Sequence, residues 1–167
     1  MISVNQAIAI VQNGVEPTSQ IDSIDISKAH RFILRNDIVS EINMPPFRQS
    51  AMDGYALHLH EDFNYKLVGE VKAGDPFNPI LKKGESVRIF TGAPVPETAN
   101  AVIMQERVSV DKDYITIDRA VTVNDNIRPK GEQVKKGQTA LKKGALLTPA
   151  AIAFATSLGV TEVSVYK

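Results

Sequence analysis

The first twenty residues carry a helical pattern of hydrophobic and polar positions. The apolar side chains recur every three or four residues along one face, at Val4, Ala7, Ile8 and Val11. Ser3 and Gln6 have the spacing of a capping box, Gly14 can end the helix, and Pro17 lies just beyond it. The pattern predicts an amphipathic helix within residues 1–20 whose apolar face needs a partner.

From Asp53 onward the pattern changes to short strands. Five β-rich runs are separated by Gly, Pro, Asp and Asn: GYALHL, YKLVGEV, SVRIF, AVIMQERVSV and YITIDRAV. No helical period lies between them, which favours a small barrel or sandwich. The sequence therefore predicts a β domain at residues 46–127, inserted into a mixed outer region.

The outer region, residues 21–45 with 128–167, combines short strands and helices. QIDSIDIS and VTEVSVY are typical of strands, and Ser27 can cap a short helix through KAHRFI. A later helix is bounded by a good N-cap, a proline suited to the first helical position and a closing glycine: Thr148, Pro149 and Gly159. The predicted fold class is α+β and β-rich.

Composition and charge exclude several classes of function. The 167 residues suit one domain or two small ones, and 19 basic residues balance 19 acidic ones. We therefore expect no nucleic-acid partner. The absence of cysteine rules out disulfides and thiolate chemistry and fits a cytoplasmic location. We see no signal peptide and no apolar run of membrane-spanning length, and so expect no membrane partner.

The stretch PPFRQSAMDGYAL, residues 45–57, places a carboxylate beside a glycine at the end of a stiff loop. The prolines fix the chain, and Ser50 supplies polar reach. Asp53 is either a solvated turn residue where a strand begins or a carboxylate held out for chemistry.

Two further loops carry candidate chemistry. In RIFTGAPVPETANAVIMQE, Gly92 lets backbone amides approach a ligand, and the Thr91 hydroxyl beside them is a plausible seat for a phosphate or oxyanion oxygen. No phosphate-loop or dinucleotide fingerprint is present. In NDNIRPKGEQVKKG, Arg128 could pair with a carboxylate or phosphate, or form a surface ion pair.

Two other patterns have a structural and a functional interpretation. His58 and His60 lie on one face of a strand and could bind a metal, or simply end the strand. The near-repeats LKKGE, VKKGQ and LKKGA are good exposed turns, or a basic cluster for an anion.

Several stretches, in order, together resemble the molybdopterin molybdenumtransferase family, the group of MoeA and the gephyrin E domain. They are PPFRQSAMDGYAL, GEVKAGDPF, GESVRIFTGAPVPETANAVIMQE, NIRPKGEQVKKGQTALKKGALLTPAAIAFATSLGV and VSVYK, and they span nearly the whole chain. The resemblance implies an elongated, discontinuous support region with an inserted β-barrel-like domain. It also implies an enzyme of molybdenum cofactor biosynthesis that inserts molybdenum from molybdate into adenylylated molybdopterin, releases AMP and uses Mg²⁺.

The resemblance assigns roles to particular residues. Asp53 of MDGYA matches an acid implicated in catalysis and is the candidate metal ligand, because a hard cation prefers carboxylate oxygens. Thr91 of TGAPVP and Arg128 of NIR match residues that line the cleft, where Thr91 could bind an oxyanion and Arg128 could neutralise charge or fix the loop. Ser50 and Gly92 are the candidate cofactor-binding residues.

The family also implies a homodimer whose cleft lies between the β domain of one subunit and the pterin-binding domain of the other. The chain departs from the family in Gln133, where an aspartate is usual, in Asn100, and in ending at Lys167 before the pterin-binding domain. We therefore expect helix 1–20 to belong to an absent domain and the chain alone not to complete the reaction. The alternatives are a stand-alone binding or dimerisation module and a metal-storage protein that uses His58 and His60.

Overall fold

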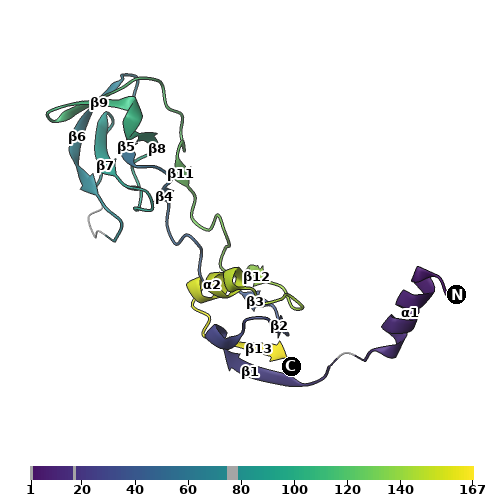
Figure 1. The fold of residues 1–167 in the computed structure, drawn as a ribbon. Coiled ribbons are helices and arrows are strands. Elements are labelled where there is room, and N and C mark those ends of the chain that lie inside the picture. The colour runs from purple at the N-terminus through teal and green to yellow at the C-terminus, as the bar shows by residue number, and fades with distance from the viewer. Residues whose placement is uncertain (1, 17, 75–78) are drawn as a thin grey trace. The chain divides into compact units, whose positions relative to one another are not determined.

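The computed structural model describes residues 2–16, 18–74 and 79–167, and the chain forms two compact units (Figure 1). The support unit combines Met1–Ser40 with Gln138–Lys167, and the β unit is Glu41–Gly137. Pro17 and residues 75–77 of the GEVKAGDPF stretch lie outside the described residues.

The β unit is built on a sheet with the strand order β8-β5-β7-β6-β10-β9. The strands of this unit are β4 (Gln49–Ser50), β5 (Gly54–Leu57), β6 (Asn64–Val71), β7 (Glu85–Ile89), β8 (Ala101–Met104), β9 (Val108–Asp111), β10 (Tyr114–Ile117) and β11 (Ile127–Arg128). β6 and β7 are parallel, the other pairs in the sheet are antiparallel, and β11 pairs with β4. The sheet is curled into a half-barrel.

One predicted strand is two strands in the structure. The run AVIMQERVSV is interrupted by a 3-10 turn, η2 (Gln105–Arg107), which separates β8 from β9. The Gln105 amide donates to the Asp53 carbonyl oxygen at 3.0 Å, so the ladder with β5 ends there.

β5 is buried on both faces of the sheet. Tyr55 and Leu57 belong to a cluster with Tyr65, Ile103 and Ile115, whereas Ala56 belongs to the cluster on the other face. Alternation along the strand sends successive side chains to opposite faces, so this short strand joins the two cores of the unit.

The support unit has its own core and smaller sheets. Its elements are α1 (Val4–Gly14), β1 (Ile21–Asp25), η1 (Ile26–Lys28), β2 (Ile33–Leu34), β3 (Ile38–Val39), β12 (Thr139–Leu141), α2 (Pro149–Ser157) and β13 (Glu162–Tyr166). The strands form the sheets β1-β13-β2 and β12-β3. The predicted cap of α2 is confirmed, because the Thr148 hydroxyl accepts from the Ala151 amide at 3.2 Å.

The short helix predicted through KAHRFI is wrong. The structure has a single 3-10 turn, η1, in which the carboxylate of Asp25 accepts from the Ser27 amide at 2.8 Å. Ser27 is thus inside the turn and Asp25 is its cap. Arg31 has a φ of 72°, which an α-helix does not allow, and the chain passes directly into β2.

α1 forms as predicted, but no residue in it is buried. Its capping box is complete: the Ser3 hydroxyl accepts from the Gln6 amide at 3.2 Å, and the Ser3 amide donates to the Gln6 side chain at 2.9 Å. Val4 is 76% exposed and Val11 is 62% exposed. Within the described residues, the apolar face of α1 is therefore left without the partner that its pattern calls for.

The division between the units differs from the predicted segments. Residues 41–45 and 128–137 belong to the β unit. Backbone hydrogen bonds join these two segments to each other. The Met44 amide donates to the Val134 carbonyl, and the Gly131 amide donates to the Pro45 carbonyl, both at 2.9 Å.

The fold class is α+β and strand-rich, as predicted. Neither helix in the described part of the chain combines the length and hydrophobicity that crossing a bilayer would need.

Candidate functional site

Asp53 and Thr91 meet at one end of the β sheet. β5 and β7 are antiparallel with Gly54 opposite Ile89, so the residue before β5 lies near the residues that follow β7. The Thr91 amide donates to Asp53 Oδ1 at 2.7 Å, and the Thr91 hydroxyl donates to the same oxygen at 2.8 Å. The structure therefore brings together two residues that the sequence analysis assigned to one site.

Gly54 is required by the close approach of β5 and β8. A Cβ atom at this position would lie 1.9 Å from the Ile103 carbonyl oxygen, which is backbone and cannot move aside cheaply. The glycine after Asp53 is thus explained by packing within the sheet. It keeps the β5 backbone against β8 at the point where Asp53 begins the strand.

The hydrogen bonds from Thr91 stabilise the ionised form of the Asp53 carboxyl. The pKa of the Asp53 carboxyl is lowered from its ordinary value of 3.8, first by the Thr91 amide, then by the Thr91 hydroxyl, and further by the charge of Arg88. Both Thr91 donors bind Oδ1, and no donor among the described residues reaches Oδ2. The site therefore presents one free, negatively charged oxygen on an exposed residue.

Three successive amides of the loop after β7 already have hydrogen-bond partners. Besides the Thr91 amide, the Gly92 amide donates to the Ser50 carbonyl at 2.9 Å, and the Ala93 amide donates to the Phe90 carbonyl at 3.0 Å. These three amides are therefore occupied in the structure, and the assignment of an oxyanion seat to this loop stays a prediction. The φ of Gly92 is 82°, so the glycine makes the turn that lets Thr91 face Asp53.

Ser50 lies inside the loop that carries Asp53. It is 1% exposed, and its hydroxyl donates to the Met52 carbonyl at 2.6 Å. The structure thus gives Ser50 a role in shaping the loop between β4 and β5. Its assignment to cofactor binding, like that of Gly92, stays a prediction.

Arg128 lies beside the same loop. It belongs to β11, where its register partner is Gln49 of β4. The residue is exposed, and no hydrogen bond or ion pair of its guanidinium involves a described residue. Gln133 is also exposed, and its amide donates to the Met44 carbonyl at 2.9 Å. Arg128 is thus placed near the Asp53 loop, and its charge is unpaired within the described part of the chain.

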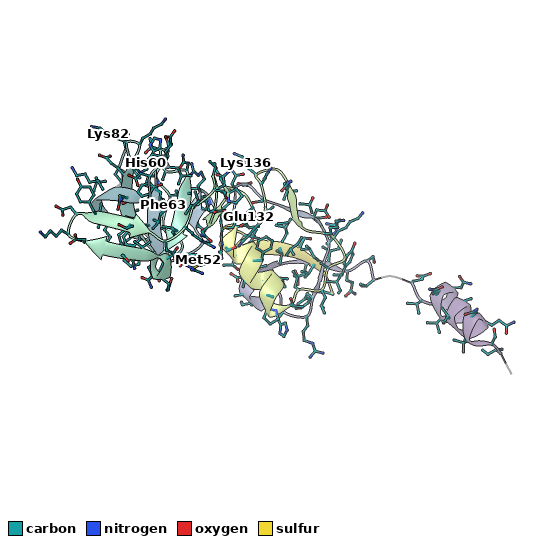
Figure 2. All side chains as sticks on the ribbon, turned by 90° about the horizontal axis from the view of Figure 1, so that it is seen from above. Met52, His60, Phe63, Lys82, Glu132 and Lys136 are labelled. Atoms are coloured by element: carbon teal, nitrogen blue, oxygen red, sulfur yellow. The ribbon has the colours of Figure 1, made fainter. Side chains whose placement is uncertain are left out.

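The histidine pair is engaged elsewhere in the β unit. His58 Nδ1 lies 2.8 Å from the Leu81 carbonyl oxygen, and His60 Nε2 lies 2.9 Å from that of Asn64. Figure 2 shows Met52, the residue before Asp53, well separated from His60. Among the described residues, no group of three His, Cys, Asp or Glu side chains is arranged to bind a metal.

The three KKG segments form turns. Gly84, Gly137 and Gly144 have φ values of 79°, 85° and 83°. Glycine adopts this left-handed conformation without steric cost, so the structural interpretation of the repeats is confirmed.

The sequence analysis missed Arg88 and Gln105. Arg88 lies 5.0 Å from the centroid of the Tyr55 ring and 5.2 Å from that of Phe90, and its guanidinium donates to the Gln105 side-chain oxygen. The signal that could have found Arg88 is its position in the run SVRIF. Arg88 and Phe90 are two positions apart in this run, so in an extended strand their side chains lie on the same face.

Comparisons with known proteins place this site in context. The family model described as MoeA N-terminal region (domain I and II) matches residues 2–159. A molybdopterin molybdenumtransferase of Haemophilus influenzae is 39% identical over 171 residues, covering 100% of this chain and 42% of the relative. One of Staphylococcus aureus is 33% identical over 174 residues, covering 99% of this chain and 41% of the relative.

A solved structure has the same fold. The molybdopterin biosynthesis moeA protein from Pyrococcus horikoshii OT3 superposes with a TM-score of 0.87 at 33% identity, covering 97% of this chain and 45% of that protein. The chain thus spans less than half the length of the relatives it matches.

Proposed function

This chain belongs to the MoeA N-terminal region family, and on that premise we propose that it is the N-terminal part of an enzyme that inserts molybdenum from molybdate into adenylylated molybdopterin and releases AMP. Relatives that bear the name molybdopterin molybdenumtransferase match the full length of the chain and support a role in molybdenum cofactor biosynthesis. The single observation that carries the proposal is the ionised Asp53 carboxylate with its free oxygen.

The Asp53 carboxylate fits Mg²⁺. This cation usually keeps several waters and binds through one or two carboxylates together with substrate phosphates. A single exposed carboxylate with one free oxygen suits that mode, whereas a cage made only of protein ligands would need more acidic groups. When bound, Mg²⁺ neutralises charge on phosphate oxygens. The role of Asp53 would be to hold it beside the substrate.

Thr91 and Arg128 have different roles in this proposal. Thr91 donates twice to Oδ1 of Asp53, so it orients the carboxylate and leaves Oδ2 available for a ligand. Arg128, which has no ion-pair partner among the described residues, lies near the same loop and suits the anionic part of the substrate, molybdate or phosphate. These roles separate a residue that positions the carboxylate from one that contacts the ligand.

The other parts of the site belong to the longer protein. We propose that the pterin is bound mainly by a region beyond the part of the relatives that this chain matches, and that the cleft forms in a cytoplasmic homodimer. On this proposal the 167-residue chain alone does not complete the reaction. The share of the relatives that it covers, 41–42%, supports this expectation.

The test is AMP release by the full-length protein with molybdate and adenylylated molybdopterin. Asp53→Asn keeps an oxygen that can accept from Thr91 but removes the charge, so we expect molybdate-dependent AMP release to fall about a hundredfold. Asp118→Asn is the matched control, because Asp118 is an exposed acid whose ion pair, within the described residues, is with Arg107. Its AMP release should stay within about twofold of the wild type.

The two results that oppose this proposal are distinct. If the wild-type protein releases no AMP in response to molybdate, the proposed reaction is wrong. If it does, and Asp53→Asn releases AMP at the wild-type rate, the catalytic role of Asp53 is wrong and the β unit acts as a binding or dimerisation module.

A further inference from the structure

We propose that Arg88 is a positioning residue for Asp53, because its guanidinium fixes the backbone at the carbonyl groups of Asp53 and Gly54. The importance of this orientation for turnover rests on the proposed function. The structural role does not, because it concerns only contacts within the β unit.

Two aromatic rings hold the guanidinium of Arg88. Arg88 of β7 is the register partner of Tyr55 of β5, so the two side chains share one face of the sheet. The guanidinium carbon lies 5.0 Å from the Tyr55 ring centroid and 5.2 Å from that of Phe90. Both distances suit cation–π contacts, and Arg88 is half-buried. Packing against the two rings therefore restrains the Arg88 side chain independently of its hydrogen bonds.

The hydrogen bonds of Arg88 reach the two neighbours of Asp53. Nη1 donates to the Gly54 carbonyl oxygen at 3.5 Å, and Nη2 donates to the Gln105 side-chain oxygen. The Gln105 amide in turn donates to the Asp53 carbonyl oxygen at 3.0 Å. Arg88 thus binds Gly54, which follows Asp53 in the chain, and Gln105, whose amide binds the Asp53 carbonyl oxygen.

The side-chain amide of Gln105 is oriented for this contact. Its nitrogen donates to Glu106 Oε1 at 3.2 Å, which leaves its oxygen to accept from Arg88. The planar fork of arginine can serve the Gly54 and Gln105 oxygens at once, whereas a lysine ammonium has no such fixed geometry. The positive charge of Arg88 also contributes to the lowered pKa of Asp53.

The experiment uses amide NMR of the 167-residue chain, and compares Arg88→Met with Arg107→Met. Arg107 is the matched control: it is an arginine of the same unit that pairs with Asp118 on the surface, with 49% of its side chain exposed. In Arg88→Met we expect the Thr91 amide to exchange with solvent about tenfold faster than in the wild type, because the carboxylate that accepts its bond loses its fixed position. Arg107→Met should leave this rate unchanged.

Arg88→Lys separates charge from geometry. It keeps the positive charge, so any effect of charge alone on the Thr91 exchange rate is preserved. It lacks the fork, so Thr91 exchange should still be faster. If Arg88→Met does not fold, the exchange rate in Arg88→Lys decides.

Wild-type exchange at Thr91 in Arg88→Met, or in Arg88→Lys if that variant decides, would overturn the proposal. So would an equal acceleration in Arg107→Met. These results leave the proposed reaction untouched, since AMP release by the full-length protein is measured separately. Conversely, a protein without transferase activity would still show the effect of Arg88 on Thr91.

Discussion

Two carboxylates of the β unit are held by a threonine in nearly the same way, yet they differ in what they can do. Asp125 accepts from the Thr122 amide at 2.9 Å and from the Thr122 hydroxyl at 2.7 Å, and these bonds lower its pKa as the Thr91 bonds lower that of Asp53. The bonds to Asp125 span three residues and those to Asp53 span 38.

The oxygens used by the two carboxylates also differ. Thr122 binds Oδ2 of Asp125 with its amide and Oδ1 with its hydroxyl, so both oxygens are occupied. Thr91 places both donors on Oδ1 of Asp53 and leaves Oδ2 free. A low carboxylate pKa therefore does not by itself identify a site. The free oxygen and the link between distant strands are what distinguish Asp53 from a turn residue.

The largest effect should follow from crowding the strand that begins at Asp53. Gly54→Ala drives a Cβ atom into the Ile103 carbonyl, and we expect it to lower the free energy of unfolding of the β unit by about 3 kcal/mol. Thr91 amide protection should fall more than that of Thr122. Urea unfolding and amide exchange measure the two effects.

Gly137→Ala is the control for this substitution. Its Cβ atom meets nothing within 4 Å, but the φ of Gly137 is 85°, so the cost should be only the conformational strain of about 1–2 kcal/mol. Equal destabilisation by the two variants would mean that the contact of Gly54 with β8 has no special weight.

A smaller effect should follow from removing one hydroxyl at each carboxylate. Thr91→Val and Thr122→Val each delete a hydrogen bond to a charged group, and the pKa of Asp53 or Asp125, respectively, should rise toward its ordinary value. In the full-length protein, AMP release should fall about tenfold in Thr91→Val and stay within about twofold in Thr122→Val. Equal losses of activity in the two variants would remove the distinction between them.

The smallest effect should be a dependence of stability on pH that both carboxylates share. Their pKa values are lowered only in the folded chain, so the stabilisation is complete above the unfolded value of 3.8 and is lost as pH falls through the folded values. The free energy of unfolding of the β unit should therefore decrease as pH falls below about 4.

Asn variants test this pH dependence. Asp53→Asn and Asp125→Asn should each make the acid decrease shallower, measured as urea unfolding at a series of pH values. Here the two carboxylates should behave alike, because the same two kinds of hydrogen bond act on each. An acid slope identical to that of the wild type in both variants would show that these bonds do not contribute.

The sequence predicts the parts of the structure that depend on neighbouring residues. The caps at Ser3 and Thr148 and the glycine turns of the KKG repeats all form as predicted, because each is decided within a few positions. The cap assigned to Ser27 failed for a local reason as well. Asp25, two positions earlier, accepts from both the amide and the hydroxyl of Ser27, which places Ser27 inside the turn.

The candidate site depends on contacts that no local pattern contains. Thr91 donates to Asp53 across 38 positions, and only the family resemblance put them in one site before the structure was known. The pattern also suggested free amides at Gly92, whereas antiparallel pairing turns that amide toward Ser50. Arg88 was missed because its partners Tyr55 and Gln105 come from β5 and η2, which lie near it only once the sheet forms.

The most direct test of the free oxygen is a Mg²⁺ titration of the 167-residue chain, followed by the side-chain carboxyl carbon signals of Asp53 and Asp125. Mg²⁺ needs an accessible carboxylate oxygen, so we expect the Asp53 signal and the Thr91 amide to shift while the Asp125 signal stays in place. Equal shifts of the two carboxyl signals, or no shift at Asp53, would contradict the claim that Asp53 differs from Asp125 by an oxygen kept free for a ligand.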